Sequence, residues 1–293
     1  MTKKVLVVGA GGQLGQELQR TSRPDIECLA MTRAQLDIAD LAVVAQCLDA
    51  VAPQLVINAA AYTAVDKAES EVDAAQRGNV AGPLALAQAC AQQGVRLIHI
   101  STDFVFDGSA SQPYKPDGAT APLGEYGRSK RAGELAVQRL LPHALILRTG
   151  WVYSRYGSNF VKTMLRLMSQ RDELAVVADQ IGTPTWAHGL AEAVWASAAR
   201  PQLSGIYHWS DAGVCSWYDF AVAICEEALA LGLLAKPVKI CPITTAEYPT
   251  QAPRPAYSVL DKTDSWRDFA LAGVPWRQQL RAMLEDYKAL EHG

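Results

Sequence analysis

Tyr126 and Lys130 form the only Tyr-x-x-x-Lys pair in the chain, and Thr102 lies upstream of them, just after an apolar run. On a helix, residues four apart lie on one face about one turn from each other. An ammonium beside a phenol stabilises the phenolate, so we expect Lys130 to lower a phenol pKa that is normally about 10. Tyr126 could then exchange a proton with a substrate oxygen near neutral pH, while Thr102 donates a hydrogen bond to a substrate carbonyl. These three residues are the predicted catalytic group.

A glycine-rich turn near the N-terminus is the second signal. Gly9, Gly12 and Gly15 follow a predicted strand and open a predicted helix, with the spacing Gly-x-x-Gly-x-x-Gly. Glycines allow a tight turn and a close approach of the backbone to a ligand, and a helix N-terminus favours a pyrophosphate. Gln13 and Leu14 begin this helix and belong to the same predicted contact. The turn therefore predicts a dinucleotide, and together with the Tyr-Lys pair it indicates hydride transfer to or from a carbonyl.

The residues after the second and third predicted strands bear on the choice of dinucleotide. Proteins that bind NAD usually place a carboxylate at the end of the second strand, where this chain has Arg33. A guanidinium suits a 2′-phosphate, so NADPH is the predicted cofactor, with NADH left open as an alternative. Asp37 and Ile38 follow and are predicted to flank the adenine. The other predicted cofactor contacts are Ala60, Ala61, Tyr62 and Thr63 after the third strand, together with Tyr126 and Lys130.

Short apolar runs alternate with helical patterns in the first half of the chain. Strands are expected at 3–8, 26–30, 55–57, 95–100 and 144–148, and helices at 13–20, 41–51, 74–93 and 125–141. This alternation predicts an α/β fold with a Rossmann-type, doubly wound parallel sheet, which binds ligands at the carboxyl ends of its strands. The second half has fewer strand patterns, with strands expected at 174–178 and 205–210 and helices at 160–169, 217–231 and 276–290.

This change of pattern after about residue 154 predicts two units. Residues 1–153 plus about 187–210 are expected to form an NAD(P)-binding Rossmann domain. Residues from about 154–186 plus 211–293 are expected to form a smaller C-terminal α/β lobe that closes over a substrate. A chain of 293 residues is long enough for both units.

The composition is that of an ordinary soluble protein, 49% hydrophobic and 19% charged. A net charge of −3 and a pI near 6.0 argue against nucleic acid or an anionic membrane as the main partner. No apolar run approaches the roughly 18 residues of a membrane span, and the N-terminus lacks the apolar stretch of a signal peptide. The six cysteines and five histidines show no metal-ligand spacing. We therefore expect a cytoplasmic protein with reduced cysteines and no metal site.

Several longer segments resemble a known family. They read NAAAYTAVDKAE (58–69), STDFVFDG (101–108), RTGWVY (148–153), NFVKTML (159–165), GTPT (182–185) and RPAYS (254–258). On these segments, and through nearly the whole chain, the protein resembles the extended short-chain dehydrogenase/reductase family, and within it the dTDP-4-dehydrorhamnose reductases. The resemblance implies that the C4 ketone of dTDP-6-deoxy-L-lyxo-4-hexulose is reduced with NADPH to dTDP-L-rhamnose for cell-surface polysaccharide. Tyr126 would protonate the new alkoxide.

The resemblance also implies a set of substrate contacts. Thr102 and Asp103 would contact the sugar, and Trp151 would form a wall of the sugar pocket. Arg254 would meet the diphosphate in the C-terminal lobe. The full set implied is Val65, Thr102, Asp103, Tyr126, Trp151, Asn159 and Arg254, with Thr63 and Val65 between the nicotinamide and the sugar.

The chain departs from the family pattern at several positions. Phe104 stands where the family often has Tyr, and Tyr62 where a His is common; both changes would shift affinity without abolishing the chemistry. Some members are thought to dimerise through metal-bound glutamates, for which Glu17 and Glu285 are candidates here. Gln202, however, stands where a third carboxylate would be expected. The pattern therefore argues against a Mg²⁺-bridged homodimer, and any Mg²⁺ would be structural. The oligomeric state stays open between a monomer and a homodimer.

Two alternatives remain at this point. Other nucleotide-sugar enzymes of the same fold, such as 4-epimerases and 4,6-dehydratases, prefer NAD, and the dehydratases typically have an Asp-Glu pair after the Thr. This chain has Asp103-Phe104 there, and Arg33 favours NADPH, so a simple reductase is the better interpretation. A relative of this fold serves as a non-catalytic, NADP-binding regulatory subunit. The intact Thr102, Tyr126 and Lys130 argue against that role.

Overall fold

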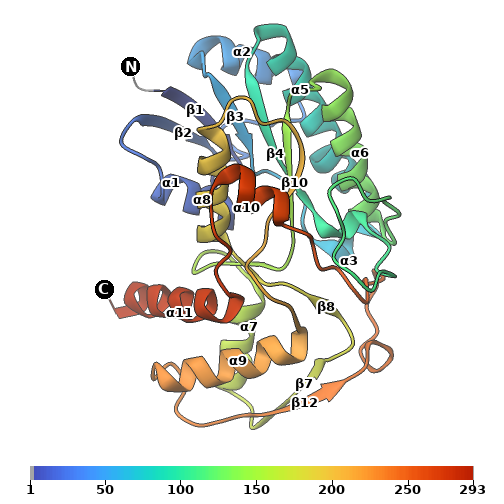
Figure 1. Ribbon diagram of the computed structural model, residues 1–293, viewed down its shortest axis with the longest axis vertical. Coiled ribbons are helices and arrows are strands. Elements are labelled where there is room, and N and C mark those ends of the chain that lie inside the picture. Colours follow the sequence, from blue (N-terminus) through green and yellow to red (C-terminus); the bar gives the residue numbers. More distant parts are fainter. Residues whose placement is uncertain (1–2, 293) are drawn as a thin grey trace.

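A computed structural model describes residues 3–292 of the chain, and a six-stranded sheet lies at its centre (Figure 1). The strands are β1 (Lys3–Val8), β2 (Ile26–Met31), β3 (Leu55–Asn58), β4 (Arg96–Thr102), β5 (Leu145–Thr149) and β10 (Gly205–His208). Their order is β10-β5-β4-β3-β1-β2, and all neighbours are parallel. This topology confirms the predicted Rossmann-type fold.

Helices cover both faces of the sheet, as Figure 1 shows. One face carries α1 (Gln13–Arg20) and α8 (Ala187–Ala198), and the other carries α2 (Leu41–Val51), α5 (Gly82–Gln93) and α6 (Glu125–Leu140). Side chains alternate between the two faces along a strand. In β1, Val5 and Val7 accordingly pack beneath α1 and α8, whereas Leu6 and Val8 pack beneath α2, α5 and α6. The inner strands of the sheet are thus largely buried on both faces, whereas the edge strands β2 and β10 are only partly buried.

Short helices such as α3 (Val65–Ala68) and α10 (Thr263–Phe269) were not predicted, and two larger differences from the sequence-based expectation have a physical reason. The pattern did not predict α8, because an alanine-rich helix that is buried nearly all round lacks a clear apolar–polar period. The single helix expected over 74–93 is also wrong in its middle. The structure has α4 (Val72–Gln76), then a π-helical turn η1 (Arg77–Ala81), then α5. Pro83 has no N–H to donate to the carbonyl four residues earlier, which explains why the ladder widens at this turn.

A second group of elements has its own hydrophobic core below the sheet in Figure 1. Its main elements are α7 (Phe160–Met168), β7 (Glu173–Val177), α9 (Trp217–Ala230), β12 (Lys239–Ile243) and α11 (Trp276–His292). Three pairs of strands lie in this region: β7 with β12, β6 (Val152–Tyr153) with β9 (Thr185–Trp186), and β8 (Ile181–Gly182) with β11 (Cys215–Ser216). The remaining short elements are α3 (Val65–Ala68), η2 (Asp103–Val105), η3 (Thr245–Glu247) and α10 (Thr263–Phe269).

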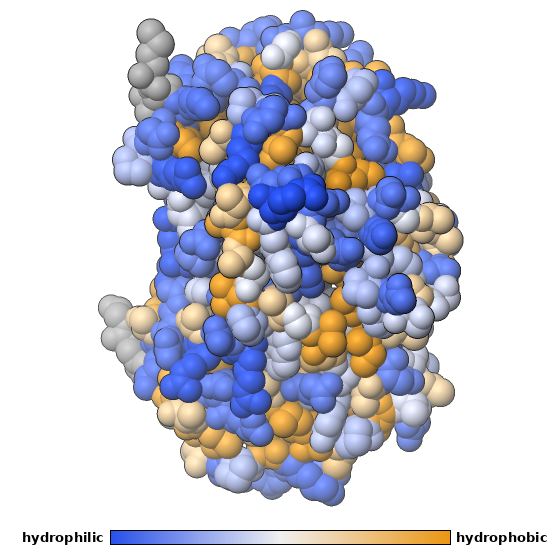
Figure 2. Space-filling view, viewed as in Figure 1, coloured by the Kyte–Doolittle hydropathy of each residue, from blue (hydrophilic) through white to orange (hydrophobic). Residues whose placement is uncertain are grey.

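The outer surface is mixed in character. On the face shown in Figure 2, hydrophilic and hydrophobic residues are interspersed over both halves of the molecule. Across residues 3–292, no helix combines the length and the apolar character that crossing a bilayer would require. All six cysteines lie in this range and are free thiols.

The ligand-binding edge is set by the point where the strand order reverses. The chain leaves β1 toward β2 on one side and continues later with β3 on the other, so the loops after β1 and β3 diverge at this point. Gly9 has a φ of +85°, and a Cβ built on it would lie 2.5 Å from the backbone N of Ala60. Only glycine permits this approach of the two loops.

A substitution at Gly15 tests this packing. A Cβ on Gly15 would lie 2.2 Å from the carbonyl oxygen of Gly9. We expect Gly15→Ala to lower the free energy of unfolding by roughly 1–3 kcal/mol, even though alanine favours the helix, because the backbone cannot yield as a side chain can. Urea denaturation measures this. In the control Gly11→Ala, the nearest contact would be Thr32 Cγ2 at 3.9 Å; equal losses in both variants would contradict the packing argument.

Candidate active site

The predicted catalytic residues come together at the carboxyl end of β4. Thr102 ends β4, Asp103 begins η2, and Tyr126 and Lys130 lie one turn apart on α6. All four side chains are buried, with exposed fractions between 2% and 9%. Burial in a polar cluster of this kind magnifies every electrostatic interaction, because little water screens it.

The phenol of Tyr126 is surrounded by Thr102, Asp103 and Phe104. Its ring meets the ring of Phe104 edge to face, with centroids 5.6 Å apart. Burial raises the pKa of Tyr126 to about 12; a hydrogen bond with Thr102 lowers it, and the charge of Asp103 raises it further. The expectation that Lys130 lowers this pKa is therefore wrong for this structure. Tyr126 is protonated at neutral pH, which is the form that a proton donor needs.

Lys130 contacts the main chain of β4. Its Nζ donates a hydrogen bond to the carbonyl oxygen of Ile100 at 2.8 Å. Burial lowers the pKa of Lys130 to about 8, although the nearby carboxylate of Glu134 acts in the opposite direction. Glu134 itself forms a buried ion pair with Arg148 at 2.8 Å, which ties α6 to β5. The catalytic helix is therefore held on the sheet by buried charges.

Asp103 is the second acid at this point. Its Oδ1 accepts a hydrogen bond from Thr102 Oγ1 at 3.0 Å. Burial raises the pKa of Asp103 to about 6, while hydrogen bonds with Ser258 and Thr102 act to lower it. A Cβ on Gly150 would lie 2.4 Å from the Asp103 carboxylate, so the loop after β5 closes against it.

A pocket of about 450 Å³ lies between the loops after β1, β2 and β3, and Tyr62 in its wall packs against the cluster that contains Tyr126. Tyr126 and Lys130, which were predicted to contact the cofactor, do not line this pocket. Its walls include nine of the predicted cofactor contacts: Gly9, Gly12, Arg33, Asp37, Ile38, Ala60, Ala61, Tyr62 and Thr63. The glycine turn leaves the N-terminus of α1 open toward it, and the small side chains at 60 and 61 leave room for a flat ring. The residues present therefore fit a dinucleotide.

Three predicted cofactor contacts in the first turn of α1, namely Gln13, Leu14 and Gly15, do not line this pocket. Leu14 packs in the core beneath α1, and Gly15 packs against the Gly9 backbone. Gln13 donates to the Val152 carbonyl at 3.4 Å and accepts from Asn159 Nδ2 at 2.9 Å. Gln13 and Asn159, predicted for cofactor and substrate, thus contact each other and join α1 to the start of α7.

Arg77 is a pocket residue that the sequence analysis missed. It lines the pocket with Arg33, and its Nη2 forms an ion pair with Asp37 Oδ2 at 2.6 Å. This pairing lowers the pKa of the Asp37 carboxyl, as does the charge of Arg33. The sequence pattern placed Arg77 within a regular helix and gave no indication that it lines the pocket. The π-helical turn that begins at Arg77 was not predicted. Two guanidiniums, not one, therefore line the pocket wall at the end of β2.

Of the predicted substrate residues outside the catalytic group, Trp151 packs against the second hydrophobic core. Trp151 has a φ of +51° and stacks on Trp217, with ring centroids 3.5 Å apart. Gly182 leaves room for this indole, since a Cβ there would lie 2.6 Å from Trp151 Cε2. Arg254 forms an ion pair with Asp66 at 2.8 Å, next to Val65 at the start of α3. Their contacts with a sugar nucleotide stay predictions.

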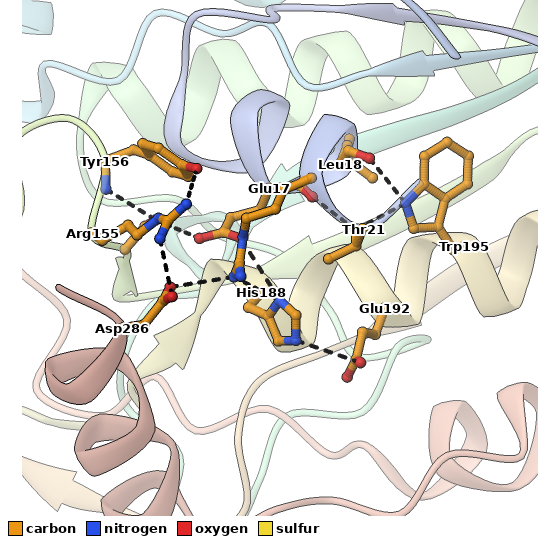
Figure 3. A network of polar contacts seen from close by, with 11 residues as sticks. Glu17, Leu18, Thr21, Arg155, Tyr156, His188, Glu192, Trp195 and Asp286 are labelled. Atoms are coloured by element: carbon orange, nitrogen blue, oxygen red, sulfur yellow. Dashed lines mark hydrogen bonds and ion pairs between the residues drawn. The ribbon is translucent and has the colours of Figure 1, made fainter. Parts of the chain in front are cut away.

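Glu17, the first candidate for a metal ligand, is fully buried and paired within the chain (Figure 3). Its carboxylate accepts hydrogen bonds from Arg20 at 2.8 Å and Ser154 at 2.9 Å, and lies 3.7 Å from His188. Burial acts to raise its pKa, but these hydrogen bonds outweigh it and the net pKa is lowered. Across residues 3–292, no three His, Cys, Asp or Glu side chains are grouped in a way that could hold a metal ion.

The same network links the two halves of the chain. Asp286 on α11 lies 3.4 Å from Arg20 on α1 and 3.0 Å from Arg155, which follows β6. Figure 3 shows Arg155 and Asp286 pointing toward one another from two separate segments. The network thus holds α11 beside α1, the helix that follows the glycine turn.

The comparisons with known proteins agree with this geometry. The RmlD substrate binding domain family matches residues 3–289. The chain belongs to this family. A dTDP-4-dehydrorhamnose reductase of Aggregatibacter actinomycetemcomitans is 43% identical over 285 residues, which cover 95% of this chain and 97% of the relative. The spore coat polysaccharide biosynthesis protein SpsK of Bacillus subtilis is 45% identical over 287 residues, covering 97% of each.

A solved structure extends the comparison to three dimensions. The crystal structure of dTDP-4-dehydrorhamnose reductase from Bacillus anthracis in complex with NADP matches with a TM-score of 0.92 and 37% identity. The match covers 98% of this chain and 100% of the other. The RmlD family match runs from β1 into α11, so the glycine turn, the catalytic group and the loop with Arg254 all lie within it.

The buried carboxylate of Glu17 yields a testable pH effect. Glu17→Gln removes one acidic partner from each of Arg20 and His188, which keep Asp286 and Glu192, so we expect a loss of about 2 kcal/mol in unfolding free energy at pH 7. Because the folded pKa of Glu17 lies below 4.5, its contribution is present above that pH and is lost as the pH falls through the folded pKa. The difference between wild type and variant should shrink there. Glu27→Gln, at an exposed position, is the control; a difference that does not change with pH would contradict the assignment.

Proposed function

We propose that this protein reduces the C4 ketone of dTDP-6-deoxy-L-lyxo-4-hexulose (dTDP-4-dehydrorhamnose) to dTDP-L-rhamnose with NADPH, in the cytoplasm, for cell-surface polysaccharide. The observation that carries the proposal is the buried, protonated Tyr126 beside Thr102, at the strand edge that also holds the dinucleotide pocket. Membership of the RmlD family and the likeness to a dTDP-4-dehydrorhamnose reductase in complex with NADP support the substrate and the cofactor.

Each catalytic side chain has one task in this reaction. Thr102 donates a hydrogen bond to the ketone oxygen and so fixes the carbonyl and polarises it. Tyr126, protonated because its pKa is about 12, gives its proton to that oxygen as negative charge develops there. Lys130, a cation below its pKa of about 8, would bind the ribose of the dinucleotide, the other contact predicted for it. Bound NADPH would supply the hydride. No metal is needed for these steps.

The remaining predicted residues divide between the two ligands. Residues 1–153 plus about 187–210 hold the dinucleotide, and residues from about 154–186 plus 211–293 hold the nucleotide sugar. In this division Arg254 meets the diphosphate and Trp151 forms a wall of the sugar pocket. Asn159 acts through Gln13, because the two side chains are hydrogen-bonded at 2.9 Å. NADH is a weaker alternative to NADPH, because Arg33 and Arg77 both line the pocket.

Tyr126→Phe tests the proton donor. Removing the hydroxyl keeps the ring and its contact with Phe104, so we expect the variant to bind NADPH as wild type does. Turnover of the dTDP-4-keto sugar should fall by about 10²- to 10⁴-fold, the usual contribution of a positioned acid. Steady-state NADPH oxidation measures turnover, and fluorescence titration measures binding. Tyr248→Phe, at a side chain that is 58% exposed, is the matched control. Turnover near the wild-type value in Tyr126→Phe would remove Tyr126 from its assigned role.

Arg33→Ala tests the choice of dinucleotide. A guanidinium that binds the 2′-phosphate contributes a charge-assisted hydrogen bond to NADPH and nothing comparable to NADH. We expect the dissociation constant for NADPH to rise about tenfold, with NADH changing less than twofold. Arg171→Ala, at an exposed position in the other half of the chain, is the control. Equal weakening of both dinucleotides would show that Arg33 does not distinguish them.

A further inference from the structure

The loop that carries Arg254 lies against the short helix α3, 188 residues earlier in the chain. Asp66 Oδ2 accepts a hydrogen bond from Arg254 Nη2 at 2.8 Å, and Asp66 Oδ1 accepts one from the backbone N of Ala252 at 3.1 Å. One carboxylate therefore holds both the guanidinium and the main chain next to it. Charge-assisted bonds of this kind fix geometry as well as adding energy.

The second terminal nitrogen of the Arg254 guanidinium, Nη1, is not paired with Asp66. Nη1 is enclosed, and among residues 3–292 it has no hydrogen-bond partner. A buried donor on a charged group is unfavourable until an acceptor meets it, so this nitrogen suits an anionic group of a ligand. Asp66 thus pairs with one terminal nitrogen of the guanidinium, and the other has no acceptor among the described residues.

The end of α3 contacts the catalytic helix. Glu69, which follows α3, accepts a hydrogen bond through Oε1 from the backbone N of Glu125 at 2.7 Å. Glu125 is the first residue of α6, and the N-cap Gly124 provides no side chain to cap the helix. A carboxylate at this position satisfies an unpaired N–H and favours the positive end of the helix dipole. Tyr126 is the next residue.

The three segments meet at Gly124. A Cβ on Gly124 would lie 2.6 Å from Glu69 Oε1 and 3.5 Å from Pro253 Cδ, so glycine leaves room for the carboxylate and for the loop. The loop with Arg254, the turn of α3 and the first turn of α6 are therefore packed against one another.

We propose that α3 positions both the nucleotide-sugar loop and the first turn of α6, with Asp66 and Glu69 as the positioning residues. Asp66 holds Arg254 so that Nη1 faces the diphosphate of the substrate. Glu69 holds the first turn of α6 and thereby the phenol of Tyr126. The identity of the diphosphate rests on the proposed function. The two residues act on different steps: Asp66 sets affinity for the nucleotide sugar, and Glu69 sets turnover.

The first test replaces Asp66 by Asn. The amide can still accept from Ala252, but it no longer pairs its charge with Arg254. We expect the KM for the dTDP-4-keto sugar and the dissociation constant of dTDP to rise about tenfold, with kcat and the KM for NADPH within about twofold of wild type. Asp73→Asn, the same change at an exposed residue of α4, should alter none of these values. A lower kcat with unchanged dTDP affinity would overturn the role of Asp66.

A double-mutant cycle shows whether Asp66 acts through Arg254. If it does, Asp66→Asn should have less than about a twofold effect on dTDP affinity once Arg254 is replaced by Gln. A purely structural role of Asp66 predicts the same loss in both backgrounds. Additive effects of the two substitutions would therefore contradict the proposal.

Substitutions of Glu69 test the other end of α3. Glu69→Ala removes the acceptor for the Glu125 N–H, so we expect kcat to fall about tenfold while dTDP affinity stays within twofold of wild type. Glu69→Gln keeps an acceptor oxygen and should restore most of the lost kcat. A variant Glu69→Ala with wild-type kcat, or one that loses dTDP affinity instead, would overturn the assignment.

The dTDP measurements separate this proposal from the proposed reaction. If the wild type binds dTDP but does not reduce the dTDP-4-keto sugar, the proposed reaction fails, while the double-mutant cycle on dTDP affinity still decides whether Asp66 acts through Arg254. If the wild type binds no dTDP, then neither the nucleotide-sugar site nor the role of Asp66 stands.

Discussion

The close approach of the loops after β1 and β3 is the constraint on which the rest of the site depends. Gly9 and Ala60 come together so tightly that no side chain fits between them. This contact closes the floor of the dinucleotide pocket at the point where the strand order reverses. β4 pairs with β3 on the side away from β1. Thr102, the last residue of β4, therefore lies next to the loop that follows β3. The catalytic helix α6 then has to meet that same edge.

Burial decides the chemical state of the catalytic group. An enclosed site disfavours charge, so the pKa of Tyr126 is raised, that of Asp103 is raised and that of Lys130 is lowered. The result is a phenol that stays protonated until an oxygen with developing negative charge meets it. Lys130 stays close to its transition between charged and neutral forms, supported by a carboxylate one turn further along α6. This arrangement suits proton donation in a reduction better than the removal of a proton from an alcohol.

The sequence predicted the parts of the site that depend on local pattern. Glycine spacing, alternating strands and helices, and the Tyr-x-x-x-Lys pair are all local, and they led to the correct fold class and to half of the residues that line the dinucleotide pocket. Arg77, by contrast, is placed by a π-helical turn that follows from Pro83, and its partner Asp37 lies 40 residues away. The direction of the Tyr126 pKa was wrong because spacing along a helix says nothing about desolvation. Asp66 and Glu69 were visible as part of a motif, but only the fold shows what each contacts.

The proposed reaction can be measured directly. The decisive measurement is to incubate the purified protein with NADPH and the dTDP-4-keto-6-deoxy-L-sugar, made in situ from dTDP-glucose by a 4,6-dehydratase and a 3,5-epimerase, and to identify the product. We expect NADPH to be oxidised in step with the formation of dTDP-L-rhamnose. NADPH that binds but is not oxidised, or a product other than dTDP-L-rhamnose, would contradict the proposed reaction.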